Sequence, residues 1–261
     1  MKFPAHKISA PFLIWTCLFS LPAQSTENKW DGWYGGLNGS FKSTKTTANY
    51  AHQHIGTCTN LNFGSEWPGD SCEGNQDYQT SVNSDASSFA AGLFVERLWN
   101  SDGRVYGLRL DALGGSENPV SQSILLSHTW GDTLNFDVHL KESVNVRAIV
   151  GFPQDDWLPF VTMGAVFQKA GLGFQQDQPP YNLPVNRNKD QWVSGGILGM
   201  GIKKQWGAEW IVTAELLYQK LNTFELSSDG VLLSGGLKYP TTNLDVNSDT
   251  RTLRVGIARR F

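Results

Sequence analysis

Residues 143–167 read SVNVRAIVGFPQDDWLPFVTMGAVF, two alternating segments joined by a short polar turn. From Val144 to Phe152 every second side chain is apolar, whereas the opposite face carries Ser143, Asn145, Arg147 and Gly151. This two-residue period places apolar and polar side chains on opposite faces of a β-strand. The stretch therefore predicts a β-hairpin with one apolar face and one polar face.

The rest of the chain contains further strand-like segments of the same kind. Each has about the 9–11 residues that a tilted strand needs to cross a bilayer. They number eight, and we expect them at Trp33–Phe41, Ser88–Trp99, Arg104–Gly115, Ser143–Phe152, Leu158–Phe167, Gln191–Lys203, Trp210–Lys220 and Arg251–Phe261.

The connections between these segments alternate strictly between short and long. A membrane β-barrel has short periplasmic turns and longer outer loops, whereas a β-sandwich has no reason for this asymmetry. The pattern predicts an all-β fold, an eight-stranded antiparallel transmembrane β-barrel with long extracellular loops. The short connections are 100–103, 153–157 and 205–209, and the long ones are Lys42–Ser87, Ser116–Glu142, Gln168–Asp190 and Leu221–Thr250.

Composition agrees with this fold and argues against a helical membrane protein and a nucleic-acid-binding protein. Charged residues make up 17% of the chain, below the roughly 25% usual in soluble domains. No stretch after residue 25 approaches the ~18 apolar residues of a membrane helix. A soluble β-sandwich would fit the same composition, so the connections decide. The formal net charge is −3, with no basic run, which argues against a nucleic-acid partner.

Five tryptophans lie at the start of the first strand or beside the three short turns. An aromatic girdle at a membrane interface would have this placement. Tryptophans of a soluble core would have no reason to gather at turns, so we expect the girdle. The five are Trp33, Trp99, Trp157, Trp206 and Trp210.

The polar faces of the strands carry charges that a barrel would place inside. An isolated charge in a dry interior costs several kcal/mol, so we expect a paired network. The predicted interior charges are Glu96, Arg109, Asp111, Arg147, Lys203, Glu215 and Arg254.

One strand breaks its own alternation. Residues 133–142 also alternate, which predicts that the fourth strand projects beyond the bilayer. Glu142 falls on the apolar side, so we expect it at the membrane edge or at a β-bulge.

The ends and cysteines indicate an exported protein. Residues 1–23 have the lysines, apolar run and small residues of a signal peptide, leaving 24–261 as the barrel domain. Without the two leader lysines the net charge becomes −5. Cys58 and Cys72 then form an even pair, which favours one disulfide in the first long loop over a metal site.

Several segments resemble the opacity-type outer-membrane β-barrel family, the small porin-family outer-membrane proteins of alphaproteobacteria. They are Trp30–Gly39, Val144–Val166, Gly195–Tyr218 and Arg254–Phe261. The resemblance implies location in the outer membrane of a Gram-negative bacterium, among outer-membrane lipid and lipopolysaccharide. It also implies that the terminal Phe261 is the signal read by the barrel assembly machinery.

An eight-stranded barrel is filled by its own side chains, so we expect no wide general pore, no cofactor and no catalytic site. The first hypothesis is a structural or envelope role, or contact with a host surface or ligand. The alternative is binding of haemin through the loops, where Tyr50, His52 and His54 lie close in sequence and His can ligate haem iron. Two histidines in a long polar loop are, however, more often ordinary solvated loop residues.

A second alternative is a lipid-modifying enzyme. Ser127 and His128, with Asp132 or Asp137, lie near the outer rim, where a nucleophile, base and orienting acid would have to meet. No recognisable motif surrounds them, and His139 on the polar face of an extended strand is more simply structural.

Overall fold

The computed structural model describes residues 29–53, 77–116, 120–125, 133–177, 185–228 and 241–261. Within these ranges no helix is long and apolar enough to cross a membrane. The described residues form ten strands: β1 (Gly32–Gln53), β2 (Asp77–Ser101), β3 (Arg104–Ser116), β4 (Val120–Leu125), β5 (Thr133–Gly151), β6 (Trp157–Asp177), β7 (Val185–Trp206), β8 (Trp210–Leu221), β9 (Phe224–Ser228) and β10 (Thr241–Arg260).

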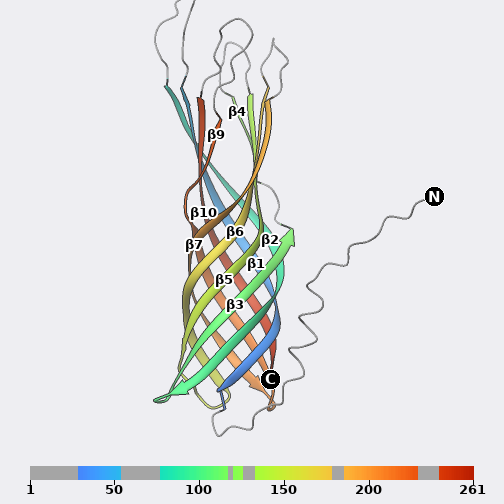
Figure 1. Cartoon of the computed structure of the whole chain (residues 1–261), viewed down its shortest axis with the longest axis vertical. Coiled ribbons are helices and arrows are strands. Elements are labelled where there is room, and N and C mark those ends of the chain that lie inside the picture. The colour runs from blue at the N-terminus through green and yellow to red at the C-terminus, as the bar shows by residue number, and fades with distance from the viewer. Residues whose placement is uncertain (1–28, 54–76, 117–119, 126–132, 178–184, 229–240) are drawn as a thin grey trace, which may run out of the picture.

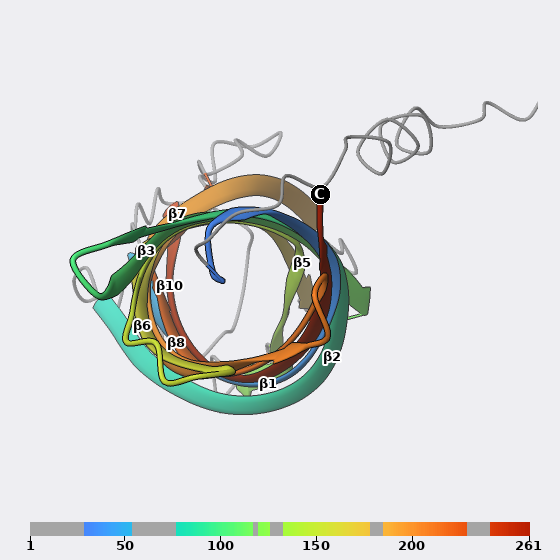
Figure 2. The same cartoon turned by 90° about the horizontal axis from the view of Figure 1, so that it is seen from below.

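Eight of the described strands close into an antiparallel barrel. The order is β1-β2-β3-β5-β6-β7-β8-β10, and β10 pairs back with β1. Figure 2 shows the resulting ring from the end. The short β4 pairs with β5 beyond the end of β3, and β9 pairs with β10 beyond the end of β8. The eight-stranded antiparallel barrel predicted from the sequence is confirmed.

The strands are much longer than bilayer thickness requires, and here the predicted loop boundaries are wrong. β1 continues to Gln53 and β2 begins at Asp77, inside the predicted loop Lys42–Ser87. The other three long connections likewise contain strand residues. The predicted strand lengths were those needed to cross a bilayer. Threonine-rich segments such as 43–49 also favour strands, and they pair in register beyond the membrane-level barrel.

The short turn between β2 and β3 has the geometry that its sequence favours. Asp102 and Gly103 have φ angles of 52° and 71°. A two-residue loop with both φ values positive matches the twist of the flanking strands, and Asp-Gly suits it.

Beyond the membrane-level barrel the strands continue as an outer extension. It consists of the residues after Phe41 on β1 and after Phe167 on β6, those before Phe89 on β2 and before Trp192 on β7, and the strand residues of β4, β5, β9 and β10 that pair beside them. Figure 1 shows the strands narrowing as they enter it. β7 pairs with β8 only from Gly195 onward. In the described residues the extension thus divides into two sheets, β2-β1-β10-β9 and β4-β5-β6-β7.

An apolar core lies between these two sheets. It draws Ala48, Leu244 and Val246 from one sheet and Val138 and Leu172 from the other. The fourth strand does project beyond the bilayer level, as predicted, and a register shift between Leu140 and Ser143 places Glu142 in a bulge. The expected bulge at Glu142 is therefore confirmed.

Candidate functional site

The outer wall of the barrel is apolar between two aromatic rims. Its side chains are large hydrophobics that in a soluble protein would be covered. Exposed apolar side chains on alternate positions, around a polar interior, are the arrangement of a membrane-spanning barrel. They include Leu37, Leu93, Leu108, Leu110, Val146, Val161, Met163, Leu198, Met200, Leu216, Leu253 and Val255.

The rim at the short turns carries the five predicted tryptophans, all of them exposed, from 36% for Trp99 to 70% for Trp206. The girdle is confirmed and the alternative of core tryptophans is wrong. A second rim contains Phe41, Phe89, Phe167 and Trp192.

The distance between the two rims fits a membrane. From Phe89 to Trp99 is ten residues of β2, about 34 Å along the strand and about 25 Å along the axis at the usual tilt. A transmembrane barrel has an apolar band about 25 Å tall.

The seven predicted interior charges all lie buried inside the barrel, each no more than 3% exposed. Asp111 is the centre of their network. Arg147 Nη2 donates to Asp111 Oδ2 over 3.0 Å, and Arg109 Nε donates to Asp111 Oδ1 over 2.9 Å. Arg254 Nη1 is 3.2 Å from the same Oδ1. One carboxylate thus holds three guanidinium groups.

A second carboxylate ties two of those arginines together. Arg109 Nη1 donates to Glu215 Oε1 over 2.9 Å, and Arg147 Nη1 donates to Glu215 Oε2 over 3.0 Å. Lys203 Nζ donates to both oxygens of Glu96, over 2.7 and 2.8 Å. Four cations and three carboxylates form this ion-pair network, so most of the buried charge is compensated.

Sequence reasoning found these seven positions because they share the polar face of their strands. It missed Lys42, which is also buried, because Lys42 fell at the start of a predicted loop. Close packing explains why a glycine stands at position 164, opposite Arg147 on the neighbouring strand. A Cβ there would lie 2.0 Å from the Val146 carbonyl oxygen, so a side chain would force the strands apart.

A cluster of buried apolar side chains lies on each side of the ion-pair network inside the barrel. At the short-turn end, Trp30, Tyr34, Leu98, Leu158 and other buried side chains form one cluster. Trp30 is only 2% exposed, unlike the rim tryptophans. The core of the outer extension forms the other cluster. In the described residues the ion-pair network thus lies between two clusters of buried apolar side chains.

The remaining predicted site residues divide by location. Tyr50 and His52 lie on β1, but the positions of their side chains are outside the described part, as is all of His54. Their haemin-binding role stays a prediction. The signal peptide and the residues Cys58, Cys72, Ser127, His128 and Asp132 also lie outside the described ranges.

Asp137 and His139 lie on β5 in the outer extension, where both are partly exposed. In the described ranges no group of three His, Cys, Asp or Glu side chains could hold a metal ion. Phe261 follows β10, and its backbone N–H donates to the Trp33 carbonyl oxygen over 3.0 Å. Its role as an assembly signal stays a prediction.

No protein-family model matches the chain, and no curated protein matches it. Among solved structures, the chain is similar to small outer-membrane barrels. The attachment invasion locus protein Ail of Yersinia pestis is 12% identical, with 88% of this chain and 99% of that chain covered and a TM-score of 0.37.

Two further barrels give similar values. Neisserial surface protein A is 10% identical, with 84% and 97% covered and a TM-score of 0.35. The outer membrane protein OprG of Pseudomonas aeruginosa is 13% identical, with 89% and 97% covered and a TM-score of 0.44. At these values the likenesses say nothing of function.

Proposed function

We propose that the protein is a sealed anchor in the outer membrane of a Gram-negative bacterium, which holds the outer extension and its loops at the cell surface. The observation that carries the proposal is the barrel itself, apolar outside and packed inside. A barrel with this exterior is stable in lipid, and one with this interior does not conduct solutes freely. Its role is then structural, or one of contact with a host surface or ligand.

The outer extension supports a role outside the membrane. β2 continues twelve residues beyond Phe89, to Asp77, which is about 40 Å along the strand. The extension has its own apolar core between two sheets. A rigid scaffold that raises loops away from the lipid surface is the usual arrangement for a protein that makes contacts through loops.

Location and orientation are tested together by cysteine labelling on intact cells. Glu225→Cys on β9 and Ser101→Cys beside the β2–β3 turn are both exposed positions at opposite ends of the barrel. Each is made in a chain carrying Cys58→Ser and Cys72→Ser. A membrane-impermeant maleimide should label position 225 on intact cells, and position 101 only after permeabilisation. Labelling at 101 alone would contradict the orientation.

Insertion as a barrel is tested separately on purified outer membranes. A closed barrel resists SDS until boiled, so matched unboiled and boiled samples should differ in mobility on a gel. A soluble periplasmic species without this shift would contradict the proposed function.

A further inference from the structure

Three outward-facing cations at the tryptophan rim each pair in register with a rim tryptophan. Arg97 is opposite Trp33, Arg259 is opposite Trp210, and Lys204 is opposite Trp157. Equivalent positions make these cations directly comparable. They differ in what neutralises them.

Two of the three cations have a carboxylate partner. Arg97 Nη1 lies 2.8 Å from Asp31 Oδ1, and Arg259 Nη2 lies 2.8 Å from Glu209 Oε2. These ion pairs are supplied by the chain itself. The charges of Arg97 and Arg259 are therefore already neutralised by carboxylates of the same chain.

Lys204 is exposed and differs from the other two. Within the described ranges no carboxylate oxygen lies within 4.0 Å of its Nζ. The ammonium lies instead over the ring of Trp157, 4.7 Å from its centroid. Asp156, the next residue before Trp157, is in an ion pair with Lys29. Lys204 attracts the Asp156 carboxylate only from a longer distance, so among the described residues it is the rim cation without a close carboxylate partner, and its ammonium can accept one from outside the chain.

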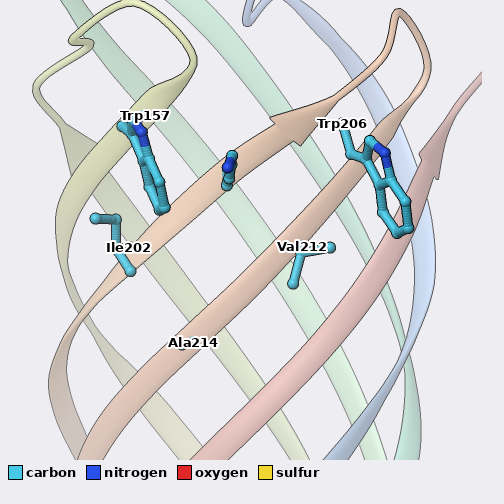
Figure 3. Close-up of a pocket in the computed structure, with 6 residues that line it drawn as sticks. Trp157, Ile202, Trp206, Val212 and Ala214 are labelled. Carbon is cyan, nitrogen blue, oxygen red and sulfur yellow. The ribbon is translucent and has the colours of Figure 1, made fainter.

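A groove opens on the lipid-facing wall beside this ammonium. It has a volume of about 330 Å³ and is lined by Trp157, Ile202, Lys204, Trp206, Val212 and Ala214. Figure 3 shows Trp157 and Trp206 on its two sides, with Ile202 below Trp157 and Val212 below Trp206.

The hollow has a cause in the cross-strand register. Ile202 pairs with Ala214, and Lys204 pairs with Val212. The small side chain of Ala214 leaves space beside the larger Ile202, and Trp206 lines one side of that space.

We propose that this groove binds one acidic glycerophospholipid of the periplasmic leaflet, with its phosphate on Lys204 and an acyl chain along Ile202, Val212 and Ala214. The inference rests on the proposed function, because it needs the barrel in a membrane. The short-turn rim faces the periplasm in such barrels, where the leaflet holds phospholipid. A lysine stem lies along apolar surface while its ammonium meets the headgroups, and tryptophan suits this interface.

The test is native mass spectrometry of the folded full chain in detergent, titrated with dioleoylphosphatidylglycerol or dioleoylphosphatidylethanolamine. Lys204→Gln removes the charge, and Ala214→Trp fills the groove. Lys220→Gln is the matched control, an exposed outward-facing lysine toward the other end of β8. Unboiled and boiled gels of each sample report the folded barrel, so failure of the proposed function is seen separately.

The wild-type chain should retain one phosphatidylglycerol in preference to phosphatidylethanolamine. Lys204→Gln should weaken this binding about fivefold, the factor that one basic residue contributes near an anionic membrane surface. Ala214→Trp should weaken binding with the charge intact, and Lys220→Gln should leave it unchanged. Equal losses for Lys204→Gln and Lys220→Gln, or no retained lipid in a folded sample, would overturn the inference. So would capture of lipopolysaccharide or a second copy of the chain by the same groove.

Discussion

The membrane-level barrel and the outer extension are built on the same strands but have opposite interiors. Between the aromatic rims, β5 turns Ser143, Asn145 and Arg147 inward, whereas in the extension it turns Val138 and Leu140 inward. The bulge between Leu140 and Ser143 makes the change, because one extra residue switches the inward face.

The difference follows from what lies outside each region. Lipid covers the membrane-level wall, so apolar side chains face out and the interior can be polar if every charge is paired. Around the extension the exposed side chains are polar, among them Lys45, Asn49 and Asp85, and the interior is apolar. Burial of apolar surface stabilises that second region as it does a soluble protein.

A polar layer joins the two interiors. Thr44 and Thr250 share a hydrogen bond of 3.0 Å, and Gln219 Nε2 donates to Gln168 Oε1 over 2.7 Å. These hydrogen-bonded neutral groups lie between the ion-pair network and the apolar core, and the buried Lys42 lies on the same inward face of β1 as Thr44.

The largest effect should come from Asp111→Leu. The variant removes the carboxylate that holds three arginines, and breaking a buried ion pair from one side costs about 3–5 kcal/mol. The measurement is the free energy of unfolding in urea with refolded protein in micelles. Asp85→Leu, at an exposed position of β2, is the control. Equal losses in the free energy of unfolding for the two variants would show that the ion-pair network does not stabilise the barrel.

Lys203→Met should also destabilise by about 3–5 kcal/mol, because it leaves the buried Glu96 carboxylate with only the more distant Arg109, whose Nη1 lies 3.8 Å away. Adding Glu96→Gln should recover much of that loss, since the charge no longer needs a partner. Urea unfolding of both single variants and the double variant gives the coupling energy. Additive losses would show that the two groups do not depend on each other.

Leu172→Ala should cost about 2–5 kcal/mol by leaving a cavity in the core of the extension. The loss should be local, so protease should cut the extension faster while the unboiled band of the membrane-level barrel persists. Met163→Ala, on the lipid-facing wall, is the control and should leave the cleavage rate of the extension unchanged. Loss of the unboiled band in Leu172→Ala would show that the two regions unfold together.

The smallest effect should be a pH dependence in the extension. The hydrogen bond from Lys141 lowers the pKa of the exposed Asp190 carboxyl. Its contribution is present above the ordinary carboxyl pKa and is lost as pH falls through the lowered one, below about pH 4. Asp190→Asn should remove this acid sensitivity of protease cleavage. High salt should weaken it in the wild type, and an identical acid profile in Asp190→Asn would exclude the pair as its source.

The membrane-level barrel could be predicted because lipid imposes a strict alternation. Arg147 and Glu215 were found from the face they share with other polar residues, without knowledge of their contacts. The partners were not predictable, since Lys203 meets Glu96 and not Glu215 only through the stagger of strands far apart in sequence.

The outer extension was largely missed for a different reason. In water a strand has no fixed length, so segments rich in Thr, Ser and Asn such as 43–49 also fit a loop. The misfit of Glu142 was the one local signal that the inward face changes. The burial of Trp30 was not predictable either, because nothing in the local sequence distinguishes a tryptophan buried inside the barrel from one exposed at the rim.

Conductance across a planar lipid bilayer shows whether the membrane-spanning barrel is closed by its own side chains. The sample is refolded wild-type protein whose unboiled band shows a closed barrel. We expect no sustained conductance above that of protein-free lipid, because the ion-pair network and both apolar clusters are buried inside the barrel. Reproducible open-channel steps from folded wild-type protein would contradict it.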